Sequence, residues 1–212
     1  MHSLRTIVIT EPKAIPSEIE IIQDLFKAGL KTLHIRKPGY SRKRMTRYIN
    51  LIPKKYHDRL VLHSHYGLAV RFKLRGIHFT EKAQRPSFWG WIQRRIFRNS
   101  RPSLTISASY HNLEKVEKLW DIYDYIFLSP VFESISKKDK MKPLRHGRIQ
   151  DALRVTKAKV VALGGVDETK VLACRDMGFY GVALMGSIWQ SPDPVENFKE
   201  IRELCRATSP LV

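Results

Sequence analysis

Three glycines near the end of the chain stand where two short apolar runs stop. The runs read VVALGGV over Val160–Val166 and GVALMGSIW over Gly181–Trp189, so they meet glycine at Gly164, Gly165 and Gly186. Glycine lets a backbone approach an anion closely, and the N–H groups that start a following helix point at it. Two consecutive units of this kind are typical of the phosphate site at the last two strands of a (β/α)8 barrel. The sequence therefore predicts binding of a phosphorylated small molecule.

The segments that follow the expected strands are rich in Arg, Lys, His, Ser and Gly and poor in carboxylates. Arginine offers a fork of donors to phosphate oxygens, and lysine offers a mobile point charge. We therefore expect an anionic substrate with more than one phosphate, and no pair of carboxylates for acid–base chemistry. The segments are Glu11–Lys13, Arg36–Gly39, His63–His65, Thr80–Gln84, Ser109–His111, Ser129–Lys142, Gly164–Val166 and Gly186–Ile188.

Alternating strand and helix patterns along the chain must position these segments. A helix is expected over Ser17–Ala28, with Ser17 as N-cap and Gly29 ending it, and others start near Ser41, Tyr66, Ser87, Leu113, Gly147, Thr169 and Val195. Eight strand–helix repeats predict an α/β protein with one closed (β/α)8 barrel, and a doubly wound open sheet is the alternative. The strands are expected at Thr6–Thr10, Thr32–Ile35, Leu60–His63, Gly76–Phe79, Leu104–Ser107, Tyr123–Leu128, Val160–Leu163 and Val182–Met185.

Length and composition agree with a single barrel domain over residues 1–212. A chain of 212 residues that is 43% hydrophobic can bury one sizeable core. No charged, apolar leader and no membrane-length apolar run is visible, so we expect no membrane association. Cys174 and Cys205 show no metal-ligand spacing, and the expected location is cytoplasmic and disulfide-free.

The net charge of +18 raises the question of a nucleic-acid partner. The basic clusters fall mostly on expected outer helix faces and loops, and they are not interleaved with regularly spaced aromatics. No helix-turn-helix, zinc finger or RNP pattern is present. The sequence therefore favours small phosphorylated substrates over specific nucleic-acid binding.

Six motifs stand in order along the chain: LHIRKPG (Leu33–Gly39), RGIHF (Arg75–Phe79), SASYHNLEKV (Ser107–Val116), YDYIFLSPVFESISKK (Tyr123–Lys138), VVALGGV and GVALMGSI. Together they resemble the family of thiamine-phosphate synthase and its paralogue, the TenI-type thiazole tautomerase. The resemblance runs from the first strand to Ile188 and implies a TIM barrel. In the synthase, the thiazole phosphate nitrogen displaces pyrophosphate from hydroxymethylpyrimidine diphosphate, which gives thiamine phosphate.

The resemblance implies roles for individual residues. Arg36, Lys137 and Ser109 are implied as catalytic residues, with Arg36 at the place of the arginine that holds the diphosphate. His34 stands where the synthase usually has glutamine and TenI-type proteins often have histidine. The other implied substrate-binding residues are Lys37, His63, His111, Ser134, Ser136, Gly165, Gly186 and Ser187.

The resemblance also implies a Mg²⁺ ion, which prefers oxygen ligands. The synthase binds it through Asn-Asp after the third strand and an Asp after the fourth, but these positions read His63–Ser64 and Ala83 here. The family's second basic residue falls at Pro38, with Lys37 beside it as a substitute. The chain thus departs from the family at its metal ligands, and no metal ligands are assigned.

Several of these residues have simpler structural explanations. His78 is expected to pack at the end of its strand with hydrogen bonds, and His111 to cap the next helix. His63 and His65 lie at the surface or contact diphosphate; their spacing also suits a transition metal, but no third ligand is visible. The apolar residues around Trp89–Phe97 are expected in the core or in a homodimer contact.

Three functions remain open from the sequence. The first is a thiamine-phosphate synthase or a divergent form of it, which uses a metal or neutralises the leaving pyrophosphate with histidine, lysine and arginine instead. The second is a TenI-like isomerase, but that branch has a catalytic histidine where this chain has Pro130, as the synthase does. The third is a thiazole-phosphate-binding paralogue without catalysis. We favour the synthase, because Pro130, the two serines and Lys137 follow its pattern.

Overall fold

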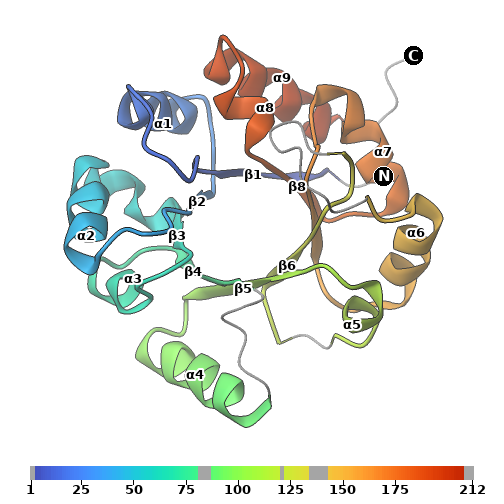
Figure 1. Ribbon diagram of the computed structural model, residues 1–212, viewed down its shortest axis with the longest axis horizontal. Helices are drawn as coiled ribbons and strands as arrows, with labels where there is room; N and C mark the ends of the chain where they lie inside the picture. Colours follow the sequence, from blue (N-terminus) through green and yellow to red (C-terminus); the bar gives the residue numbers. More distant parts are fainter. Residues whose placement is uncertain (1–2, 81–86, 120–121, 134–142, 208–212) are drawn as a thin grey trace.

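Eight short parallel strands close into a barrel, seen end-on in Figure 1. The computed structural model describes residues 3–80, 87–119, 122–133 and 143–207, with the backbone alone for 87–93. Strand β1 pairs with both β2 and β8, so the sheet has no free edge and the (β/α)8 barrel is confirmed against the open sheet. The strands are β1 (Arg5–Ile9), β2 (Leu33–Ile35), β3 (Leu60–Leu62), β4 (Gly76–Phe79), β5 (Thr105–Tyr110), β6 (Tyr125–Leu128), β7 (Val160–Leu163) and β8 (Gly181–Leu184).

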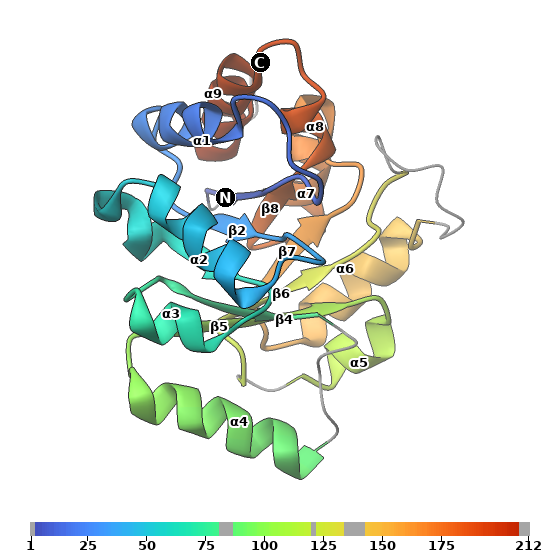
Figure 2. The same ribbon diagram turned by 60° about the vertical axis from the view of Figure 1, so that its left-hand side comes forward.

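Helices follow the strands and form the outer ring of the barrel (Figures 1 and 2). The α-helices are α1 (Glu18–Lys27), α2 (Arg42–Leu51), α3 (Gly67–Arg71), α4 (Ser87–Ser100), α5 (Leu113–Glu117), α6 (His146–Val155), α7 (Val171–Met177), α8 (Gly186–Trp189) and α9 (Pro194–Arg206). Two 3-10 turns, η1 (Lys54–Arg59) and η3 (Glu168–Lys170), precede β3 and α7. None of the helices that the structure describes is long and apolar enough to cross a membrane.

The expected elements agree with the structure except at their ends. Strand β5 continues to Tyr110, so Ser109 lies on the strand and not in the loop after it. Ser17 occupies the N-cap position of α1 in a left-handed conformation (φ 52°), but its side chain makes no cap hydrogen bond. Gly29, at φ 99°, follows that helix as expected.

Alternation along the strands divides the buried side chains between two cores. On β1, Val8 packs outward against the helices, whereas Ile7 and Ile9 point into the barrel. Such alternation leaves one residue in two of each strand to fill the barrel interior. The apolar part of this interior consists of Ile7, Ile9, Tyr125, Phe127, Val161 and Ala183.

The two ends of the chain meet where the barrel closes. Thr6 of β1 pairs with Val182 of β8, and the indole N–H of Trp189 donates to the carbonyl oxygen of Ile9 over 2.7 Å. These contacts tie the first strand to the last strand and to the helix that follows it.

Candidate functional site

The barrel interior is polar on the side formed by β2 to β5. His34 lies on β2, His63 directly after β3 and His78 on β4, and their imidazole rings come together inside the barrel. The rings of His63 and His78 stack at 4.3 Å between centroids, and His34 lies 5.1 Å from His63 and 5.2 Å from His78. We call these three residues the histidine cluster.

A chain of hydrogen bonds runs from Tyr125 through the histidine cluster. The Tyr125 hydroxyl lies 2.6 Å from His34 Nε2, and His34 Nδ1 lies 2.9 Å from His63 Nε2. The remaining nitrogen of His63, Nδ1, is buried and has no hydrogen-bond partner among the residues that the structure describes. An unpaired buried polar group of this kind costs about 1–3 kcal/mol, so this ring nitrogen is an exception that needs an explanation.

His78 is held from both sides by serines of β5. Its Nδ1 lies 2.9 Å from the Ser107 hydroxyl, and its Nε2 lies 2.7 Å from the Ser109 hydroxyl. The register explains these contacts, because His78 pairs with Ser107 across the β4–β5 ladder. The expected packed, hydrogen-bonded histidine is therefore confirmed, and Ser109 of the candidate site is one of its partners.

Burial keeps the histidine cluster uncharged. It lowers the pKa of His78 to about 3, and the positive charge of Arg36 acts in the same direction. Burial, followed by the proximity of His78, also holds the pKa values of His34 and His63 well below their usual range. These neutral imidazoles can donate or accept hydrogen bonds, but they do not supply positive charge to a phosphate. The expectation that His63 neutralises pyrophosphate as a cation is therefore not supported.

Arg36 supplies positive charge next to the histidine cluster. It follows β2 directly, and Thr10 holds its backbone: the Arg36 N–H donates to the Thr10 hydroxyl over 2.9 Å. The half-buried guanidinium lies near enough to His63 and His78 to shift both pKa values. Because its position is set through its backbone, Arg36 can present its side chain to an anion without losing a packing contact of the fold.

Lys37 points away from the site and is buried in the fold. Its ammonium group donates to Glu18 Oε1 at 2.6 Å and to the carbonyl oxygens of Glu11 and Lys13 at 2.7 and 2.8 Å. Three acceptors satisfy all three of its N–H groups. The sequence-based assignment of Lys37 to substrate binding is thus corrected: it joins the loop after β1 to α1 and to the loop after β2.

A glycine turn follows β7, as the sequence predicts. Gly164 and Gly165 have φ values of 94° and 67°, which L side chains rarely adopt. A Cβ at Gly165 would meet the carbonyl oxygen of Glu133, so the turn packs directly against the segment after β6. At the end of β8, Gly186 begins α8, and the buried Ser187 hydroxyl has no partner within the described part of the chain. Both glycine segments lie at the carboxyl ends of adjacent strands, where a phosphate can be cradled.

The structure places His111 differently from the prediction, and several other predicted site residues lie outside its described part. His111 does not cap the helix after β5: Asn112 is the N-cap, and His111 Nδ1 lies 2.6 Å from the carbonyl oxygen of Ser129. The residues Ala83, Ser134, Ser136 and Lys137 lie outside the described part of the chain, as do the side chains of Trp89 and Trp91.

The donor set does not fit the Mg²⁺ ion that the resemblance implies. Among the described residues, the group of three or more His, Cys, Asp or Glu side chains that could hold a metal is the histidine cluster. It offers nitrogen atoms, whereas Mg²⁺ requires oxygen ligands in near-octahedral geometry. His65 is not part of this group, because its Nε2 lies 2.6 Å from the carbonyl oxygen of Tyr40.

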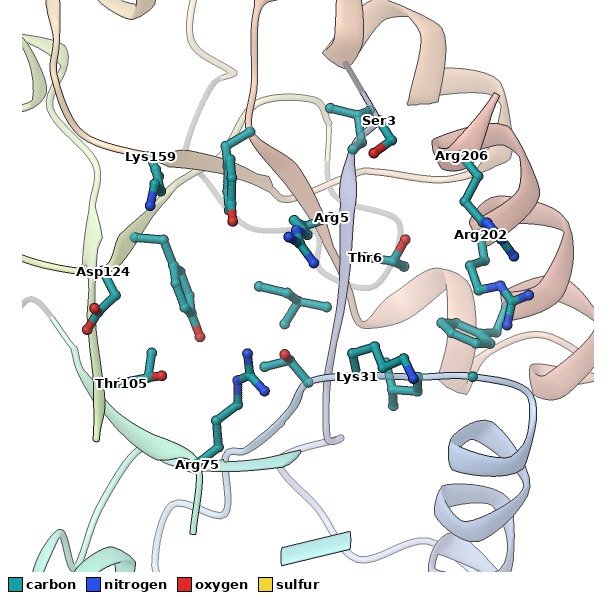
Figure 3. A pocket seen from close by; sticks show the side chains of 18 residues that line it. Ser3, Arg5, Thr6, Lys31, Arg75, Thr105, Asp124, Lys159, Arg202 and Arg206 are labelled. Carbon is teal, nitrogen blue, oxygen red and sulfur yellow. The ribbon is translucent and has the colours of Figure 1, made fainter. Parts of the chain in front are cut away.

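A basic pocket of about 730 Å³ lies at the opposite end of the barrel, around the amino ends of the strands (Figure 3). Arg5, Arg75 and Lys159 are among its lining residues, together with the single acidic residue Asp124. Asp124 is itself paired with Arg98 at 2.7 Å. In barrels of this type the amino end contributes to stability and the carboxyl end carries the chemistry, so we place the candidate site at the carboxyl end.

Sequence reasoning missed the histidine cluster as a unit. It read His34, His63 and His78 separately, each with its own motif. The detectable signal was the period of two: His34 is the middle residue of a three-residue strand, and His78 alternates with the outward-facing Ile77 and Phe79. Continuing the β3–β4 register by one residue places His63 opposite His78, whereas His34 pairs with Val61, so register alone does not bring its ring to the other two.

The fold and the site together define a (β/α)8 barrel with its candidate functional residues at the carboxyl ends of the strands. The profile of the thiamine monophosphate synthase family matches residues 6–188, and the chain belongs to this family. Curated relatives are named thiamine-phosphate synthase, which supports a role in thiamine biosynthesis.

Individual relatives agree with this assignment. Thiamine-phosphate synthase of Limosilactobacillus reuteri is 25% identical over 197 residues, covering 88% of this chain and 87% of its own length. The crystal structure of thiamine phosphate pyrophosphorylase from Bacteroides thetaiotaomicron is 31% identical, with a TM-score of 0.74 over 95% of this chain and 97% of that one. The enzyme of the same name from Pyrococcus furiosus, 17% identical, shares the fold with a TM-score of 0.77 over 95% of each chain.

Proposed function

We propose that this protein is a thiamine-phosphate synthase, which joins hydroxymethylpyrimidine diphosphate to hydroxyethylthiazole phosphate. The observation that carries the proposal is the glycine turn after β7, in a chain whose relatives are named for this reaction. Gly164 and Gly165 have positive φ values, and they turn the chain at the place where barrels of this type bind phosphate. We assign this turn, together with Gly186 and Ser187, to the phosphate of the thiazole.

The reaction exchanges one bond at the pyrimidine methylene carbon. The carbon–oxygen bond breaks and its electron pair leaves with pyrophosphate, while the lone pair of the thiazole nitrogen forms the new carbon–nitrogen bond. Negative charge on the departing group must be compensated. We assign this role to Arg36, which stands beside the uncharged histidine cluster. We assign the same role to Lys137 from the family resemblance. The roles of these residues do not involve Mg²⁺.

The histidine cluster and Tyr125 give the barrel interior donors and acceptors for a polar ring. Neutral imidazoles and hydroxyl groups recognise ring nitrogens and amino groups by hydrogen bonds without adding charge. We therefore assign the pyrimidine to the interior beside His34 and Ser109, and its diphosphate to the Arg36 side. This arrangement brings the leaving group to the positive charge.

The direct test is pyrophosphate release from the two substrates, measured with Mg²⁺ and again with EDTA. Turnover under either condition supports the proposal, and comparing the two shows whether a divalent ion is required. No turnover in either, with thiazole phosphate still bound, overturns it and leaves a TenI-like isomerase or a ligand-binding paralogue.

A matched pair of variants tests the role of Arg36. Arg36→Ala should lower turnover about 100-fold, the effect of removing one donor from a developing negative charge. Arg42→Ala removes an exposed arginine at the start of α2 and should leave turnover unchanged. Equal rates for both variants would remove Arg36 from the mechanism.

A further inference from the structure

We infer that His34, His63 and His78 form a binding site for a divalent transition metal, with Zn²⁺ the best fit. One nitrogen from each ring lies within 4.8 Å of the other two. The three come from adjacent strands β2, β3 and β4, so the barrel itself fixes their spacing. The inference does not depend on the proposed synthase activity.

The nitrogen atoms of the three rings lie close to the spacing that a metal requires. Zinc–nitrogen bonds are about 2.0–2.1 Å long and arranged as a tetrahedron, which places ligand nitrogens roughly 3.4 Å apart. His34 Nδ1 and His63 Nε2 are 2.9 Å apart. His78 stacks on His63 with 26° between the ring planes, so these two rings must turn before their in-plane nitrogen lone pairs point at one ion.

Outer contacts hold two of the rings in the way that metal-ligating histidines require. Such histidines use one nitrogen for the metal and the other for a hydrogen bond that fixes the ring. For His34 the second nitrogen is held by the Tyr125 hydroxyl, and for His78 by Ser107 or Ser109. If Nε2 of His63 binds the ion, its Nδ1 is the nitrogen left for an outer contact, and this atom has no partner among the described residues.

The donor chemistry selects the kind of ion. Three imidazoles with no carboxylate suit zinc, copper, nickel or cobalt and disfavour Mg²⁺ or Ca²⁺. Three protein ligands also leave a fourth tetrahedral position for water or another oxygen ligand. Because Arg36 adds positive charge nearby, that position favours an anionic oxygen.

The experiment uses the untagged full chain, because a histidine tag would itself bind the ion. The protein is stripped with EDTA, dialysed and titrated with Co²⁺, which gives intense visible bands only when it is four-coordinate. We expect those bands to saturate at one equivalent and to disappear when Zn²⁺ displaces the cobalt. Excess Mg²⁺ should leave the bands unchanged. No four-coordinate bands with the wild-type protein would overturn the inference.

Variants then locate the ion. His63→Ala should abolish the bands or weaken affinity more than about 100-fold, and His65→Ala, two residues away and outside the cluster, should retain them. Tyr125→Phe removes the hydrogen bond to His34 and should weaken affinity about 10-fold. Thermal unfolding checks each variant: Zn²⁺ should raise the melting temperature of the wild type and of His65→Ala, but not that of His63→Ala. Bands that persist in His63→Ala would place the ion elsewhere and overturn the assignment.

Discussion

The buried pair of Lys37 and Glu18 should respond very differently when one partner or both partners are removed. Their side chains are 0% and 5% exposed, with 2.6 Å between Lys37 Nζ and Glu18 Oε1. Burial raises the pKa of Glu18 even though Lys37 acts in the opposite direction. For the Glu18 carboxylate, the cost of leaving water therefore outweighs the benefit of its partners, which is common in buried ion pairs.

The expected loss in the free energy of unfolding depends on which of the two charged groups loses its partner. Glu18→Leu strands a fully buried ammonium group and should lower the free energy of unfolding by about 3–5 kcal/mol. Lys37→Met strands a carboxyl group that can take up a proton, so about 2–4 kcal/mol is expected. The double variant leaves no charge unpaired; it loses the two carbonyl contacts and should cost about 1–3 kcal/mol.

Urea unfolding of the four proteins measures the coupling energy of the pair. A coupling of at least about 2 kcal/mol is expected, because each single substitution harms the other partner. The exposed pair of Lys27 and Asp24 is the control: it is 2.8 Å apart, its side chains are 66% and 50% exposed, and it should couple by less than about 1 kcal/mol. A double variant whose cost equals the sum of the single costs would refute the reasoning.

Three further predictions concern the turn, the histidine cluster and the closure of the barrel. Gly165→Ala should lower the free energy of unfolding by about 2–4 kcal/mol, because the new Cβ is strained at positive φ and overpacks against Glu133, and it should also weaken thiazole-phosphate binding. The control, Gly147→Ala, adds a Cβ in open space on a helix and should raise the free energy of unfolding by about 0.5–1 kcal/mol. The pKa of His78 is lowered to about 3, so as the pH falls below 6.5 this residue takes up a proton in the unfolded chain but not in the folded one. His78 alone should therefore lower the free energy of unfolding by about 2 kcal/mol between pH 7 and 5. A free energy of urea unfolding that stays constant over this range would contradict the prediction. Trp189→Phe removes the donor to Ile9 and should cost about 1 kcal/mol, with an unchanged unfolding midpoint as the contrary result.

The fold could be predicted from sequence because its signals are local and repeated. Each strand is a short apolar run that ends at a turn residue, and the structure moves the predicted ends by only a few positions. Strand β5 is the instructive exception. Its last residues, Ser109 and Tyr110, look like loop residues in sequence, but they pair with Phe127 and Leu128 of β6.

The candidate site was only partly predictable, because its chemistry depends on which way a side chain points. The glycine turn was recognised from backbone requirements that are written in the sequence itself. The structural role of Lys37 was not recognised, because no residue near it in the sequence indicates that it pairs with Glu18, 19 positions earlier. The histidine cluster likewise exists only after three strands are aligned in register.

Closing the barrel through β1 and β8 has a consequence for how the protein is made. The Ile9 and Trp189 partners are 180 positions apart, and the pairing of β1 with β8 must wait for residues 181–184. A chain emerging from the ribosome therefore carries β1 with one uncovered hydrogen-bonding edge until residues 181–184 have been made. Such an edge can recruit a neighbouring chain, so crowded nascent chains should be more vulnerable to aggregation than the folded barrel. Slow elongation before residues 181–184 would prolong that exposure.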